Sequence, residues 1–158
     1  MGLIAVTADW FGCRKKPKPA RHTIEQISGV SLFCVHMDRS CGYSFWIRRE
    51  NTRWLFDAEC FTHDHEDETV FENREASAGD IAALLEILNR SGSIAYAENY
   101  KKPRNSPFQV LDETIYGFCL TFSDQSRYMT GGRQKELEEY FYRIAGQAGE
   151  TSKANHLP

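Results

Sequence analysis

The sequence contains no apolar run of the roughly 20 residues that a membrane-spanning helix needs. It also lacks a glycine-rich phosphate loop, because Gly131-Gly132 precedes a predicted helix without the GxGxxG or GK[ST] pattern. Neither sign of charge prevails, since 19 Lys and Arg against 22 Asp and Glu leave a net charge of −3. This balance argues against a nucleic-acid-binding protein, which usually presents a strongly basic surface.

Cysteine is present, but it is not arranged as in a disulfide-stabilised protein. The chain has five cysteines, an odd number without regular spacing: Cys13, Cys34, Cys41, Cys60 and Cys119. Small secreted domains that depend on disulfides usually carry even sets at regular spacings. The sequence therefore indicates reduced thiols and predicts a cytoplasmic protein.

The length of 158 residues is typical of one domain with short extensions. Residues 1–21 are predicted to be an N-terminal arm and basic linker, residues 22–147 a single α+β domain, and residues 148–158 a polar tail. The apolar start lies beside a basic run, so residues 1–18 also suit contact with an anionic membrane surface. An arm ahead of the domain is the favoured interpretation.

Alternating side chains predict an antiparallel meander in the first half of the domain. The segments Val30–Met37, Tyr43–Arg48 and Trp54–Glu59 alternate with the period of two that a strand requires. The turns between them hold Asp, Ser, Gly and Asn, which adopt turn geometry readily. Each predicted strand therefore has one face suited to burial and one more polar face.

Two later segments have the apolar periodicity of a helix. Ser77, three residues before Asp80, predicts a capped helix start, and Gly92 suits the left-handed end of that helix. The apolar stripe of this helix comprises Ile81, Leu84, Leu85 and Leu88. The stripe of the last helix, which is predicted to end at Gly146, comprises Leu137, Tyr140, Phe141 and Ile144.

A hairpin with strands at 115–122 and 127–130 is predicted before the last helix. Its pattern parallels the earlier hairpin: Tyr43-x-Phe45-x-Ile47 matches Tyr116-x-Phe118-x-Leu120. Two ββα units could thus pair into one sheet, although any two amphipathic hairpins look alike.

Two segments are predicted to be loops. Thr62–Glu75 is too acidic to be buried, and Ser93–Gln109 contains two prolines and several charged residues. The predicted fold is therefore α+β: an antiparallel sheet of about five strands with two main helices on one face.

Several segments after the first helix follow a distinctive order. They comprise Val110-Leu111-Asp112, Tyr116-Gly117-Phe118, Leu120, Phe122, Asp124, Thr130-Gly131 and Leu137. This order resembles that of a family of small uncharacterised bacterial α+β proteins, over roughly residues 29–146. Gln125 departs from the family, which prefers Gly in that turn. The resemblance implies an α+β fold and a cytoplasmic setting, and it brings no known activity.

Trp46, Arg48, Arg53 and Trp54 lie on adjacent predicted strands and are the candidate binding residues. Aromatic side chains and arginine are enriched at binding hot spots, and a guanidinium can stack on an indole ring. If Trp46 and Arg48 share the outer face of the sheet, they are available to a partner; the alternative is that a helix covers Trp46. The favoured prediction is a non-enzymatic interaction module that contacts another protein through the open sheet face and the acidic loop.

Cys60, His63 and His65 suggest a different function. Cysteine sulfur and histidine nitrogen are zinc ligands, and these three residues stand close enough in the sequence to share one ion. A structural zinc site usually has a second ligand pair, which the sequence lacks. The alternative prediction is therefore a zinc-binding protein or a metal-dependent enzyme, and no other cofactor is expected.

Overall fold

A six-stranded antiparallel sheet is the framework of the protein, in a computed structural model that describes residues 18–36, 42–61, 68–102 and 114–154. For residues 147–154 only the backbone is described. The strands are β1 (Ile27–His36), β2 (Gly42–Glu50), β3 (Arg53–Phe61), β4 (Thr69–Glu75), β5 (Thr114–Phe122) and β6 (Arg127–Gly131). The helices are the short 3₁₀ turn η1 (Ile24–Gln26), α1 (Ala78–Arg90), α2 (Ser93–Asn99) and α3 (Lys135–Ala154).

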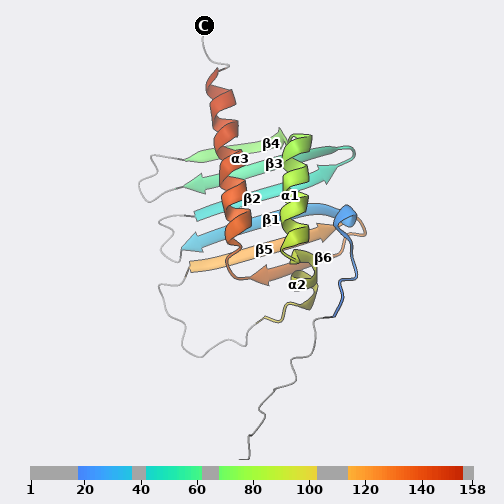
Figure 1. Ribbon diagram of the computed structural model, residues 1–158. Helices are drawn as coiled ribbons and strands as arrows, with labels where there is room; N and C mark the ends of the chain where they lie inside the picture. The colour runs from blue at the N-terminus through green and yellow to red at the C-terminus, as the bar shows by residue number, and fades with distance from the viewer. Residues whose placement is uncertain (1–17, 37–41, 62–67, 103–113, 155–158) are drawn as a thin grey trace, which may run out of the picture.

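The strand order is β4-β3-β2-β1-β5-β6, so β1 lies near the centre and pairs with both β2 and β5. The α+β class and the antiparallel sheet are therefore as predicted. The hairpins β2–β3 and β5–β6 share this sheet, and α1 and α3 run across the same face of it (Figure 1). The two hairpins do not pair directly, because β1 lies between them.

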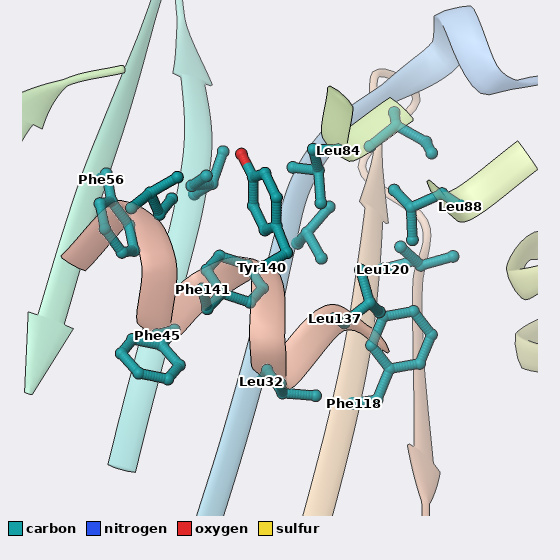
Figure 2. Packing of buried hydrophobic residues seen from close by; sticks show 14 of the residues in the cluster. Leu32, Phe45, Phe56, Leu84, Leu88, Phe118, Leu120, Leu137, Tyr140 and Phe141 are labelled. Carbon is teal, nitrogen blue, oxygen red and sulfur yellow. The ribbon is translucent and has the colours of Figure 1, made fainter. Parts of the chain in front are cut away.

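The sheet face under α1 and α3 forms the hydrophobic core. Figure 2 shows side chains of α3 and α1 packed against large apolar side chains of the central strands. The side chains of Phe45, Phe118 and Phe141 are completely buried, and the Phe141 ring stacks on Phe45 with centroids 5.3 Å apart. Each such ring stabilises the fold by roughly 1.5–3 kcal/mol through the removal of apolar surface from water.

The predicted start and end of α1 are confirmed. The Ser77 hydroxyl accepts a hydrogen bond from the Asp80 backbone N–H at 3.1 Å, which satisfies a free amide of the first turn of α1. Gly92 has φ +66°, the left-handed conformation that favours glycine, and it separates α1 from α2. Local sequence chemistry therefore determines both ends of α1.

The prediction of an acidic loop over Thr62–Glu75 is wrong for its second half, because Thr69–Glu75 forms β4 and raises the strand count from about five to six. This strand is held to the sheet by Phe71, whose ring packs edge-on against the Phe56 ring with centroids 5.1 Å apart. A register shift opposite Phe56 and Ala58 interrupts the alternation of β4, so the sequence pattern did not show a strand.

The prediction of a loop over Ser93–Gln109 is wrong for its first part, because Ser93–Asn99 forms α2, and residues 103–109 lie outside the described residues. Ile94 and Ala97, three residues apart, are buried on one side of this helix. With α2, the described chain has three α-helices rather than two main ones.

α3 also differs from its prediction, since it continues to Ala154 instead of ending at Gly146. The glycine is exposed within the helix, where it costs about 1 kcal/mol without ending the helix. Residues 148–154, predicted as part of a polar tail, are therefore helical. No helix among the described residues is both long and apolar enough to cross a membrane.

Candidate functional site

The sheet face opposite α1 and α3, here called the open face, carries the candidate site. Side chains alternate along each strand, so residues next to those of the core point to this face. No helix of the described ranges covers it (Figure 1). Five of its large apolar side chains are exposed: Val35, Trp46, Val70, Ile115 and Met129. The two other exposed large apolar side chains of the described chain, Tyr96 and Tyr142, lie on helices.

Trp46 and Arg48 lie on the open face of β2, two residues apart. The Arg48 guanidinium carbon is 4.4 Å from the centroid of the Trp46 ring, and Trp46 remains 45% exposed. Trp46 and Arg48 therefore share the outer face of the sheet, which is the arrangement required for both to be available to a partner.

Arg48 is also bound to the sheet itself. Its Nε donates to Glu50 Oε1 at 2.8 Å, and its terminal nitrogens donate to Asp57 on β3 and Asn73 on β4. The Asn73 backbone N–H in turn donates to Asp57 Oδ1 at 2.7 Å. Arg48 therefore joins three neighbouring strands and is not a free cation on the surface.

Arg53 and Trp54 begin β3 and point to opposite sides. Arg53 is exposed on the open face, in register with Glu50. Trp54 lies on the helix-covered side, where it is partly buried against the core. The guanidinium carbon of Arg49 lies 5.9 Å from the centroid of the Trp54 ring. The structure therefore brings Trp46, Arg48 and Arg53 together on one face and places Trp54 on the other.

A hollow of about 190 Å³ lies on the open face beside Trp46, here called the Trp46 groove. It extends over β3 between β2 and β4. Its lining residues are Ser44, Trp46, Asp57, Ala58, Glu59, Val70, Phe71 and Glu72. The groove thus combines an aromatic wall and the apolar side chain of Val70 with three carboxylates, because the side chains of Ala58 and Phe71 pack in or against the core on the other side.

Two of these carboxylates have no partner among the described residues. Asp57 is occupied by Arg48 and by the Asn73 amide. Glu59 and Glu72 are exposed, and neither carboxylate takes part in a hydrogen bond or ion pair with the described part of the chain. The uncompensated charge of the groove is therefore negative.

The predicted zinc ligands are only partly visible. Cys60 lies on β3 in register with Tyr43 and Thr69, half-buried against the core on the helix-covered side. His63 and His65 lie outside the described residues. Within the described ranges, no group of three His, Cys, Asp or Glu side chains is placed to hold a metal ion. Zinc binding by these three residues stays a prediction, which elemental analysis of the full chain tests.

A cluster around His22 was not predicted from the sequence. His22 Nδ1 lies 2.7 Å from Glu98 Oε1 on α2, and Nε2 lies 2.9 Å from Asp124 Oδ2 and 3.0 Å from Ser126 Oγ in the β5–β6 turn. The imidazole stacks on Phe122 with centroids 4.1 Å apart. These residues are far apart in the sequence and form no motif, so only the tertiary structure identifies them.

The serine, histidine and carboxylate of this cluster have the distances of a nucleophilic triad, but their protonation is unsuitable. The hydrogen bonds to Asp124 and then to Glu98 raise the pKa of His22, which favours an imidazolium that donates from both nitrogens. The Ser126 hydroxyl donates to Asp124 Oδ1 at 2.6 Å instead of to the imidazole. A general base must accept the proton of the nucleophile. The cluster therefore ties three segments together and does not activate Ser126.

A second hollow, of about 340 Å³, lies beside this cluster. Its lining residues are Ala20, His22, Thr23, Ile24, Glu25, Leu88, Asn89, Gly92, Ile94 and Ala95. The His22 imidazole is its main ionisable group near the core, and both ring nitrogens are already hydrogen-bonded. The Trp46 groove has the freer polar groups and is the stronger candidate.

Comparison of the chain with protein-family models, with curated proteins and with solved structures found no match. The resemblance to a family of small bacterial proteins therefore stays a prediction.

Proposed function

We propose that the protein is a non-enzymatic interaction module that binds a partner protein on the open face of its sheet. The observation that supports this proposal is the presence of five exposed apolar side chains on the face that the described helices leave uncovered. Apolar surface that a fold leaves exposed on an uncovered face favours a site of interaction. The flat face of several strands suits a protein surface better than a small molecule, which prefers a concave site.

Trp46 is the anchor of the proposed interface. It is the largest exposed side chain of the open face, and Arg48 holds its ring from one side at 4.4 Å. Because the indole is already held, little conformational freedom is lost when a partner covers it. Tryptophan is among the residues most enriched at hot spots of binding energy.

The charge of the site favours a basic partner over a second copy of the chain. Glu59 and Glu72 line the groove beside Trp46 without a partner in the described part of the chain, and the chain as a whole has a net charge of −3. A second copy brings the same excess of negative charge, whereas a basic protein complements it.

Two substitutions of equally exposed aromatic residues test the proposal. Trp46 on the open face and Tyr142 on α3 are both 45% exposed. A protein captured from source cells on the wild-type chain is purified, and its affinity for wild type, Trp46→Ala and Tyr142→Ala is measured by calorimetry. We expect Trp46→Ala to weaken binding by about tenfold or more, as for a hot-spot residue, and Tyr142→Ala to bind nearly as wild type.

One result of this experiment would contradict the proposed interface. Equal affinities for wild type and Trp46→Ala would place the interface elsewhere. Sedimentation of the isolated chain shows whether the open face binds a second copy, and urea denaturation of both variants confirms that they remain folded.

A further inference from the structure

The size of the Trp46 groove limits what can enter it. Its volume is about 190 Å³. Sites for drug-sized ligands have about 300–1,000 Å³. The groove is therefore suited to one long side chain of a bound protein rather than to a whole metabolite.

The walls of the groove determine the chemistry of that side chain. Trp46 supplies an aromatic surface on β2, and Val70 supplies an apolar surface on β4, with 59% of its area exposed. Glu59, which is in register with Val70, and Glu72 add carboxylates that no described residue of the chain pairs with. An aromatic wall beside carboxylates favours a cation with an apolar stem.

The protein already contains this combination of contacts at the same indole. The Arg48 guanidinium stacks on Trp46 and forms ion pairs with Glu50 and Asp57. A guanidinium is planar, so it can stack on a ring and bind a carboxylate with two N–H groups at once, which an ammonium group cannot do. Arginine is therefore the side chain that the groove fits best.

We infer that the Trp46 groove receives an arginine side chain of the partner, between Trp46 and Val70, with Glu59 and Glu72 as its counter-charges. The inference rests on the proposed function and specifies the partner: a basic segment with an arginine that reaches the open face. Asp57 is not part of the counter-charge, because Arg48 and the Asn73 amide occupy it.

A short peptide tests the inference without knowledge of the partner. The ¹⁵N-labelled full chain is titrated with acetyl-Gly-Arg-Gly-amide, and the indole N–H signals of the tryptophans are followed by NMR. We expect a saturable shift of the Trp46 signal at roughly millimolar peptide, while Trp54 on the other side of the sheet stays unchanged. The peptide with citrulline in place of arginine, which has the same shape without the charge, should give no saturable shift.

Matched substitutions separate a specific site from general attraction to a negative chain. Glu59→Gln with Glu72→Gln should weaken peptide binding by roughly tenfold. Glu86→Gln with Glu139→Gln removes two exposed carboxylates of the helices and should leave binding unchanged. Equal loss in both double variants, or binding of the citrulline or an equivalent lysine peptide as tightly as the arginine peptide, overturns the inference.

Failure of the inference is distinguishable from failure of the proposed function. If the peptide does not shift Trp46 while Trp46→Ala still weakens the captured partner, the arginine site is wrong and the open face stands as the interface. If Trp46→Ala leaves the partner's affinity unchanged, the interface itself is wrong, whatever the peptide does.

Discussion

His22 shows how much one residue outside the strands contributes to the fold. Its side chain is 9% exposed and that of Glu98 is 6% exposed, so their ion pair is largely removed from water. Glu98 also accepts the backbone N–H groups of Arg21 and His22, at 2.6 Å and 3.0 Å. Burial raises the pKa of Glu98, but these hydrogen bonds outweigh it and hold the pKa below its ordinary value. The segment before η1 is thereby bound to α2.

The stability of the protein should depend on pH through His22. The pKa of His22 in the folded protein is raised above its ordinary value of 6.5, so the folded state binds the proton more tightly than the unfolded chain. This stabilisation is fully present below about pH 6.5 and is lost as the pH rises through the raised pKa. We expect the urea midpoint of the wild type to fall between about pH 6 and pH 9.

The variant His22→Gln removes the titrating group and should make the midpoint nearly constant over that range. At about pH 6 the variant should be less stable than the wild type by roughly 1–3 kcal/mol, because the Glu98 carboxylate loses its cation. His36→Gln serves as the control, since His36 bonds to the Thr114 hydroxyl and lies outside the cluster. An unchanged pH dependence in His22→Gln would contradict this account.

At the level of elements, β4 is the strand that most needs support. Among the described strands it pairs with β3 alone and so forms one edge of the sheet, and it contains a register shift and the left-handed residue Asn73, with φ +56°. Arg48 and Asp57 bind the side chain and the backbone of Asn73. The irregular backbone of this edge strand is therefore stabilised from β2 and β3.

Arg48→Lys should loosen β4 without unfolding the sheet. A lysine ammonium cannot bind Glu50, Asp57 and Asn73 in the same fork geometry, so we expect a loss of about 1–3 kcal/mol in unfolding free energy. Hydrogen exchange measured by NMR should show the largest acceleration at the β4 amides, while those of β1 and β5 accelerate only by the loss of global stability. Arg53→Lys, an exposed position on the same face, is the control and should have little effect.

The whole molecule depends on one core between the sheet and the two long helices. Phe141 of α3 is completely buried and contacts the rings of Phe45 and Phe56 on two different strands. Leu84 and Leu88 of α1 belong to the same buried cluster (Figure 2). A single contiguous core of this kind favours cooperative, two-state unfolding.

Phe141→Ala should therefore destabilise the entire fold. Loss of a fully buried phenylalanine costs about 3–5 kcal/mol, a large part of the usual 5–15 kcal/mol of a domain. Far-UV circular dichroism and tryptophan fluorescence should report the same lowered midpoint. Separate midpoints from the two probes would show that the sheet and the helices unfold independently. Tyr142→Ala, at the exposed neighbouring position, should cost much less.

At the same scale, the candidate site could be predicted only in part. The period of two placed Trp46 and Arg48 on one face of β2, and the structure has them there. The same rule would have separated Arg53 from Trp54, which are adjacent on β3 and lie on opposite faces. The β4 wall of the groove was inaccessible from the sequence, because Val70 and Glu72 belong to a strand whose pairing is interrupted.

The sequence by itself determined the features that depend on near neighbours in the chain. Apolar spacing and the cap at Ser77 determine α1, and alternation determines the buried faces of β2 and β5, since these patterns follow the periods of 3.6 and 2. Only the tertiary structure decided that β1 separates the two hairpins, that Thr69–Glu75 is a strand, and that His22 meets Glu98 and Asp124. These features depend on contacts between distant segments, whose energy is available only after the chain has folded.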